Sequence, residues 1–135
     1  MIYRNEETGT ALARDLGCPA RPLSVLEEME AHCLVNATPA GMHPNEEKIP
    51  VPPAILSRFE WVMDLVYNPL RTRLLREAEA AGCRVITGLP MLVHQAAEQI
   101  RIWTGKEPPV GLMRRGGEEE LLRREREALK SKKEE

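Results

Sequence analysis

Residues 61–100 decide the fold class of this chain, and they read WVMDLVYNPLRTRLLREAEAAGCRVITGLPMLVHQAAEQI. Two short apolar runs, residues 61–66 and 84–87, each end abruptly in small or polar residues. A stretch with apolar residues at helical spacing follows each run, and Gly82 and Gly105 close these two stretches. Alternating strands and amphipathic helices predict right-handed crossovers and a parallel sheet, so the expected class is α/β.

The same alternation extends toward the amino terminus. The expected elements there are a strand end at residues 1–3, a helix at residues 6–16 and a strand at residues 33–37. Ser24 and Glu27 form a capping-box pattern that predicts a short helix to about Ala31. A proline-rich loop spans residues 43–53, and residues 53–58 suit a helical turn.

Each predicted helix has one face that should point inward, judged from the spacing of its apolar residues. These residues are Ala11, Leu12 and Leu16 in the first helix, Leu70, Leu74, Leu75, Ala78 and Ala81 in the second, and Leu92, Ala96, Ile100 and Trp103 in the third. Residues 117–135 differ in kind, because acidic residues begin the segment and lysines end it, which complements a helix dipole. With few apolar residues, this segment is predicted to be a solvated, fraying helix, and the alternative is a partner-binding tail.

Composition limits the classes of function. At 135 residues with a net charge of -2, the chain is one domain or a piece of one, and its charge favours no nucleic-acid partner. Three scattered cysteines are too few for a disulfide framework and fit a reducing compartment. No apolar run approaches the roughly 20 residues of a membrane span, and no signal peptide is evident at the first residues. We therefore expect a soluble, cytoplasmic protein with no membrane partner.

The histidines give no sign of a metal site or a catalytic base. His32 and Cys33 are adjacent and lack the spacing of zinc ligands, and His43 has no partner nearby in the sequence. His94 shares a polar helical face with Glu98 and Arg101, which places it at the surface or at the rim of a cleft. We predict no metal.

Three blocks follow the predicted strands and suit ligand binding. They are residues 36–42 (NATPAGM), residues 64–72 (DLVYNPLRT) and residues 88–96 (GLPMLVHQA). A parallel strand delivers its ligand-binding loop at its carboxyl end, so these blocks should meet at one edge of the sheet. No glycine-rich phosphate turn precedes the blocks.

In this order and spacing, the motifs Asn-Ala-Thr-Pro-x-Gly-Met, Asp-x-x-Tyr-Asn-Pro-x-x-Thr and Gly-x-x-Met-Leu-x-x-Gln-Ala resemble the carboxyl-terminal domain of shikimate dehydrogenase. That family reduces 3-dehydroshikimate to shikimate with NADPH in the biosynthesis of aromatic amino acids. The resemblance implies a partial doubly wound, Rossmann-like sheet. It also implies a partial NADP-binding domain at residues 1–110 and a charged helical tail at residues 111–135.

The resemblance assigns four residues to NADP. Arg4 takes the place of the arginine that holds the 2′-phosphate, and a guanidinium suits a phosphate on such a loop. Thr38 would lie near the ribose or the nicotinamide, and Gly88 and Met91 would lie against the nicotinamide. The alternatives are that Arg4 is a solvated surface arginine and that Thr38 only satisfies a turn.

Two further residues are assigned to the substrate. Tyr67 would face its carboxylate, where a phenol donates a hydrogen bond without adding charge, and Gln95 would bind its hydroxyls. The alternatives are a tyrosine ring packed at the sheet edge and a glutamine bonded to neighbouring backbone. Pro90 departs from the glycine common in the family, and it removes an N–H that could face the cofactor.

The resemblance also implies parts that this sequence does not show. The family's catalytic lysine and aspartate belong to a preceding substrate domain, and its first Rossmann strand carries the glycine-rich turn. The lysines here lie in loops or in the tail without the family's motif, so we expect no catalytic residue in this chain and little or no activity of the chain alone. Shikimate or 3-dehydroshikimate should bind only when the missing part is supplied.

Four alternatives follow from this partial pattern. The chain is a truncated piece of a larger enzyme, or half of a split enzyme. It is a non-catalytic module that binds a partner, or itself, through the open strand edge at residues 34–37. Within the enzyme class, an NAD-using quinate/shikimate dehydrogenase is the other possibility. Arg4 argues against NAD, whereas the acidic residues at 6–7 argue for it.

Overall fold

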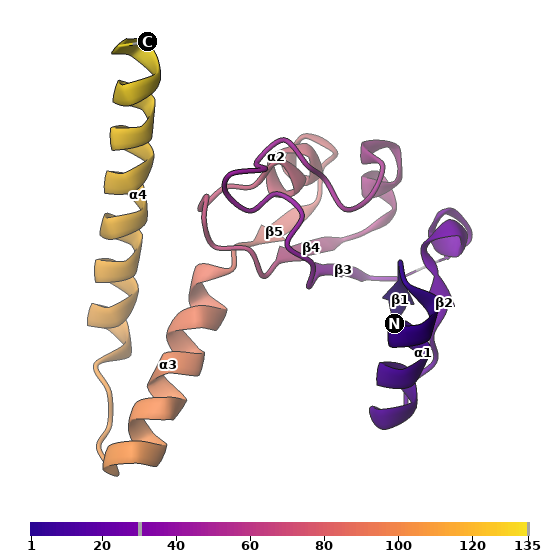
Figure 1. Ribbon diagram of the computed structural model, residues 1–135, viewed down its shortest axis with the longest axis horizontal. Helices are drawn as coiled ribbons and strands as arrows, with labels where there is room; N and C mark the ends of the chain where they lie inside the picture. Colours follow the sequence, from indigo (N-terminus) through magenta and orange to yellow (C-terminus); the bar gives the residue numbers. More distant parts are fainter. Residues whose placement is uncertain (30, 135) are drawn as a thin grey trace. The chain divides into compact units, whose positions relative to one another are not determined.

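The computed structural model describes residues 1–29 and 31–134, and these form two compact units, Met1–Ala31 and His32–Glu135 (Figure 1). The first unit contains strand β1 (Ile2–Tyr3), helix α1 (Glu6–Asp15), strand β2 (Arg21–Pro22) and the 3₁₀ helix η1 (Leu23–Glu28). Strands β1 and β2 pair in parallel, and the sequence pattern did not predict β2.

Helix α1 begins and ends at residues that suit these positions. The side chain of Asn5 accepts a hydrogen bond from Thr8 N at 3.0 Å, which caps the first turn. Gly17 follows the helix with a φ of 62°, in the left-handed region that stops a helix. At Gly9 an added Cβ would lie 2.3 Å from Tyr3 Cβ, so β1 packs directly against the helix backbone.

Two predictions for the first unit are wrong. Gly9 and Ala13 are the buried residues of α1, whereas Leu12 and Leu16 are 49% and 65% exposed. Ala11 is exposed as well. The reason is that α1 packs on β1, a strand of 2 residues, which covers only a narrow stripe of the helix.

The predicted capping box does not form either. The 3₁₀ helix η1 has Pro22 at its N-cap with no side-chain cap, and Ser24 lies inside the helix rather than before it. A hydroxyl in that position cannot reach the free amides that a capping box satisfies.

The second unit is built on a parallel sheet, as predicted. Its strands are β3 (Cys33–Asn36), β4 (Trp61–Asp64) and β5 (Arg84–Ile86), in the order β3-β4-β5. The register pairs Asn36 with Asp64 and Val62 with Val85. The 3₁₀ helix η2 (Pro53–Arg58) and helix α2 (Arg73–Ala80) connect the strands, and the α/β class is confirmed.

Helix α2 packs on the sheet with the face that its sequence predicts. Leu74, Leu75 and Ala78 are buried, together with Val62 of the central strand. The prediction fails at the ends of the face, because Ala81 is exposed after the last turn. Leu70, before the helix, is half-buried against a separate cluster described below.

Helices α3 (Leu89–Thr104) and α4 (Val110–Glu134) lie side by side, joined by a short turn (Figure 1). Leu89, Val93 and Leu121 form their shared core, and Leu70, Leu92, Val110 and Met113 are partly buried around it. This face is rotated by one residue from the predicted one: Leu92, Ala96 and Ile100 are only half-buried, and Trp103 is 75% exposed. Helix α4 covers the side of α3 that carries Leu89 and Val93. For this reason the buried face of α3 differs from the predicted one.

Helix α4 differs from the predicted tail in its start and in its packing. It begins at Val110 rather than at Gly117, and Leu121 is buried against α3. Its outer side is exposed, as expected for a solvated helix, with Glu118 and Leu122 facing solvent.

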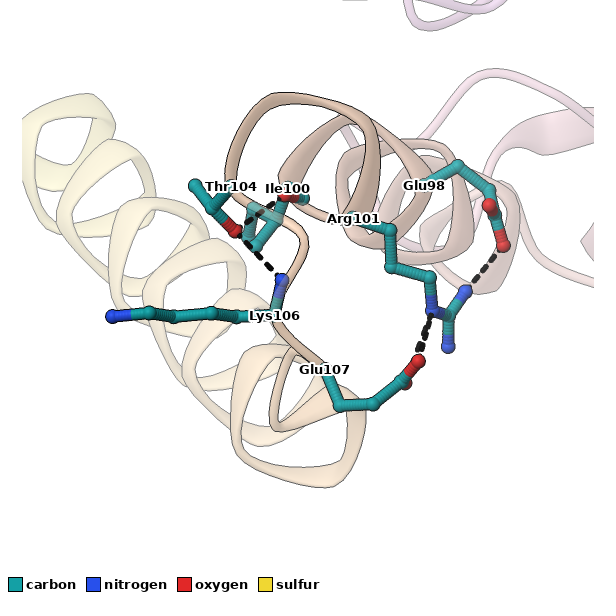
Figure 2. Close-up of polar contacts among 6 residues, drawn as sticks. All are labelled: Glu98, Ile100, Arg101, Thr104, Lys106 and Glu107. Carbon is teal, nitrogen blue, oxygen red and sulfur yellow. Dashed lines mark hydrogen bonds and ion pairs between the residues drawn. The ribbon is translucent and has the colours of Figure 1, made fainter.

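The turn between α3 and α4 is held by polar contacts (Figure 2). Thr104 Oγ1 donates to Ile100 O at 2.7 Å and accepts from Lys106 N at 3.2 Å. Arg101 pairs with Glu107 at 3.0 Å and also with Glu98. The hydrogen bond that Arg101 donates to the Glu107 carboxylate is the main cause that raises the pKa of Arg101. These contacts fix the reversal that brings α4 back along α3.

Candidate functional site

The three predicted loop blocks lie together in the second unit. Each block follows the carboxyl end of one strand, β3, β4 or β5, and the three strands are parallel neighbours. Thr38, Tyr67 and Gly88 therefore sit at the same edge of this sheet, where parallel sheets bind their ligands.

The loop after β3 is organised by Asn36. Its Oδ1 accepts hydrogen bonds from Thr38 N at 3.0 Å and from Thr38 Oγ1 at 2.7 Å. Thr38 Oγ1 accepts in turn from Ala40 N at 3.3 Å. Thr38 is exposed, but its hydroxyl proton already points to Asn36, so an arriving ligand would meet this oxygen as an acceptor.

The carboxylate of Asp64 is buried beneath this edge, and the sequence analysis assigned it no role. Asp64 is 0% exposed, and its Oδ1 accepts from Asn36 Nδ2 at 2.9 Å and from Val66 N at 3.0 Å. Its Oδ2 accepts from Thr72 Oγ1 at 2.6 Å. Burial raises the pKa of Asp64, and the hydrogen bonds from Thr72, Val66 and Asn36 oppose that rise.

A signal for this network was present in the sequence. Asp64 interrupts the apolar run at residues 61–66, and both Asp64 and Thr72 belong to the Asp-x-x-Tyr-Asn-Pro-x-x-Thr motif. A polar residue in a predicted buried strand needs a hydrogen-bond partner, and Asn36, which starts the other motif, was available for that role.

The loop after β4 carries Tyr67, which is 42% exposed. The next residue, Asn68, accepts a hydrogen bond from His43 N at 3.1 Å through its backbone carbonyl. This bond ties the loop after β4 to the loop that follows β3. Farther along, Leu70 N donates to Glu125 Oε1 of α4 at 2.9 Å.

Gly88, at the start of α3, is required by packing. A Cβ at this position would lie 2.5 Å from Leu65 O and 2.7 Å from Val66 O, which no ordinary contact permits. The turn from β5 into α3 therefore presses against the backbone that leaves β4. This requirement holds whether or not a cofactor approaches Gly88.

Met91 and Gln95 lie one helical turn apart on α3, so they share a side of the helix. Met91 is half-buried and Gln95 is exposed. His94, next to Gln95, is exposed, as its predicted place on the polar side of the helix requires.

Arg4 belongs to the other unit. It is exposed and lies between β1 and α1, directly before the N-cap residue Asn5. A guanidinium at the end of a parallel strand is chemically suited to a phosphate.

Among residues 1–29 and 31–134, no group of three or more His, Cys, Asp or Glu side chains is arranged to hold a metal ion. In the same part of the chain, no helix is long and apolar enough to cross a membrane. The cytoplasmic location stays a prediction.

Comparison with known proteins gives one consistent family. Residues 88–115 match the family model of the shikimate 5′-dehydrogenase C-terminal domain. The NADP(+) shikimate dehydrogenase of Archaeoglobus fulgidus is 49% identical over 117 residues, which is 82% of this chain and 44% of that protein. That of Pyrococcus abyssi is 55% identical over 91 residues, 67% of this chain and 34% of that protein. The chain thus spans less than half the length of these curated relatives.

Solved structures agree with the sequence relatives. Shikimate 5-dehydrogenase from Thermus thermophilus, in complex with NADP(H) and shikimate, matches with a TM-score of 0.76 and 40% identity over 87% of this chain and 44% of that one. Quinate dehydrogenase from Corynebacterium glutamicum, in complex with NAD, matches with a TM-score of 0.68 and 33% identity over 82% of this chain and 40% of that one.

Proposed function

We propose that this chain belongs to the shikimate dehydrogenase family and forms the NADP-binding part of an enzyme that reduces 3-dehydroshikimate to shikimate. The observation that carries the proposal is the placement of the three family motifs after the carboxyl ends of three adjacent parallel strands. The curated relatives that match this region are named for NADP(+).

Each proposed cofactor residue has a chemical role that its position allows. In the first unit, exposed Arg4 would pair with the 2′-phosphate that distinguishes NADP from NAD. In the second unit, Thr38 Oγ1 and the backbone of its loop would contact the ribose or the nicotinamide. Gly88 and Met91, where β5 passes into α3, would lie against the nicotinamide ring. Bound NADPH would supply the hydride.

The proposed substrate residues are Tyr67 and Gln95. The phenol of Tyr67 is exposed enough to donate a hydrogen bond to a substrate carboxylate, and the amide of Gln95 can both donate to and accept from hydroxyls. The lysine and aspartate that handle the proton are, by the family resemblance, part of a substrate domain. We therefore propose that this chain binds NADP but needs those residues to turn substrate over.

Calorimetric titration of the chain with NADPH tests this proposal. The wild-type chain should bind, and Arg4→Ala should weaken binding roughly ten- to hundredfold, because charge-assisted hydrogen bonds to the 2′-phosphate are lost. Arg14→Ala is the matched control, since Arg14 is an exposed arginine of α1 in the same unit. No binding by the wild-type chain, or equal losses in both variants, would overturn the proposal.

A second candidate is an NAD-using quinate/shikimate dehydrogenase. The similarity to the NAD-bound quinate dehydrogenase and the acidic residues Glu6 and Glu7 near Arg4 favour it. Titration with NADH separates the two candidates: NADH binding as strong as NADPH binding, unaffected by Arg4→Ala, would support this second reading.

The non-catalytic alternative is a module that associates through β3. In the described part of the chain β3 pairs only with β4, and Val35 on this strand is 50% exposed. Sedimentation of the purified chain tests it, because a concentration-dependent dimer without nucleotide binding would favour association over cofactor binding.

A further inference from the structure

Asp64 is a buried charged group that takes no part in the ligand contacts proposed above. It ends β4, faces Asn36 across the sheet in register, and is fully shielded from solvent. Its polar partners are one amide side chain, one backbone amide and one hydroxyl, and none of the three is a cation. Burial of a carboxylate without a cation is costly, so its contacts need an explanation.

We propose that Asp64 is a positioning residue that sets the geometry of two ligand-binding loops at once, the loop after β3 that carries Thr38 and the loop after β4 that carries Tyr67. This inference rests on the proposed function only for the identity of the ligands that the two loops bind. The positioning itself depends on contacts within this chain.

The first connection runs from Asp64 to Thr38 through Asn36. Asp64 Oδ1 accepts one proton of the Asn36 amide, and the second contact of that nitrogen is Ala40 O at 3.3 Å. This orientation leaves Asn36 Oδ1 facing the loop, where it accepts from both Thr38 N and Thr38 Oγ1. Without the carboxylate, Asn36 Nδ2 keeps only its longer contact to Ala40 O, so the side chain is less firmly oriented and Thr38 is anchored less well.

The second connection holds the loop after β4 at both of its ends. Asp64 Oδ1 accepts from Val66 N, directly before Tyr67, and Oδ2 accepts from Thr72 Oγ1 at the N-cap of α2. Thr72 Oγ1 also accepts from Leu75 N at 3.4 Å, so the hydroxyl links the carboxylate to the first turn of the helix. Both ends of residues 67–71 are thus held by one side chain.

A carboxylate suits this place better than an amide. Asn36 Nδ2, Val66 N and Thr72 Oγ1 all donate, and a carboxylate accepts from all three, whereas an asparagine would turn an NH₂ group toward one of them. In Asp64→Asn the amide oxygen can keep the contacts to Asn36 and Val66 and turn its NH₂ toward Thr72. This variant therefore separates the two connections.

Amide hydrogen exchange measured by NMR on the full chain tests the proposal. Asp64→Ala should raise the exchange rates of Thr38 N and Val66 N by about tenfold or more relative to Leu92 N, since each loses the equivalent of a buried hydrogen bond. Leu92 N donates to Gly88 O on α3 and reports on the unit as a whole. Asp64→Ala should also accelerate exchange of Leu75 N, because its acceptor Thr72 Oγ1 loses the carboxylate that holds it. Asp64→Asn should restore Thr38 N and Val66 N toward the wild-type rates, whereas Leu75 N should exchange as fast as in Asp64→Ala. Asp15→Asn, at the exposed end of α1, is the matched control.

Equal acceleration of Thr38 N, Val66 N and Leu92 N in Asp64→Ala would show that Asp64 only stabilises the unit, and this would overturn the proposal. If Asp64→Ala does not fold, Thr72→Val takes its place: it should accelerate Leu75 N and leave Thr38 N unchanged, and no change at Leu75 N would contradict the second connection. Absence of NADPH binding by the wild-type chain would overturn the proposed function and leave these exchange rates as a separate result.

Discussion

Two carboxylates of the second unit, Asp64 at the sheet edge and Glu120 on α4, differ in almost every physical respect. Asp64 is fully buried and bonded to neutral donors, and burial raises its pKa. Glu120 is partly exposed on α4 and accepts from Arg123 at 2.8 Å and from Arg124 at 2.7 Å. Those hydrogen bonds lower its pKa to about 2.

The difference shows which polar contacts determine tertiary structure. Asn36, a partner of Asp64, belongs to another strand, and Thr72 belongs to the start of a helix, so the carboxylate joins three elements. The partners of Glu120 are the i+3 and i+4 residues of its own helix. Such exposed pairs support a helix weakly and are screened by salt, so they contribute little to the fold.

Asp64→Ala should have the largest effect on stability. Three donors lose their acceptor in a site that water does not reach, and the free energy of unfolding should fall by roughly 2–4 kcal/mol. Urea denaturation measures this change, with Asp15→Asn as the control. A loss no greater than that of the control would remove Asp64 from the network that supports the sheet edge.

Leu121→Ala tests the side of α4 that packs on α3. Leu121 is buried with Leu89 and Val93, and its truncation should lower the free energy of unfolding by about 2 kcal/mol through lost burial and a residual cavity. Leu122→Ala is the matched control, because Leu122 is the next residue and is exposed. Equal effects of the two variants in urea denaturation would mean that α4 does not pack on α3 through this face.

The pH dependence should run in opposite directions for the two carboxylates. The folded pKa of Asp64 is raised above its ordinary 3.8, so the part of its contribution to stability that depends on pH is full below that value and is lost as the pH rises through the folded pKa. The folded pKa of Glu120 is lowered from 4.5 to about 2, so its contribution is present above 4.5 and is lost as the pH falls. Asp64→Asn should therefore gain stability relative to wild type as the pH rises from the acid side. Denaturation over roughly pH 3–7 measures this, and a relative loss would reverse the sign assigned to burial.

Glu120→Gln should have the smallest effect. Both partners of Glu120 are exposed arginines, and Arg123 also pairs with Glu127 at 2.6 Å, so the remaining charges can rearrange in solvent. Thermal unfolding at low and high salt is the measurement, and any difference from wild type should vanish at high salt. A large, salt-independent loss would show that the ion pairs of Glu120 contribute to tertiary structure after all.

Much of the local structure was readable from residue patterns. Gly17, Gly82 and Gly105 stop three helices because their positive φ values suit residues without a Cβ. The apolar runs became parallel strands, and the loop motifs follow their carboxyl ends as expected. The roles of Arg4, Thr38, Gly88, Met91, Tyr67 and Gln95 remain predictions for the binding experiments.

Sequence patterns determined the features that depend on a few neighbouring residues. These are the positions of the strands and helices, the residues that end them and the parallel class of the sheet. Contacts between distant segments decided the rest. They rotated the packing face of α3 toward α4, left Leu12 and Leu16 of α1 exposed, and assembled Asn36, Asp64 and Thr72 into one network. The physical reason is that periodicity identifies which side chains are apolar, whereas burial depends on which partner element covers them, and only the folded chain specifies that partner.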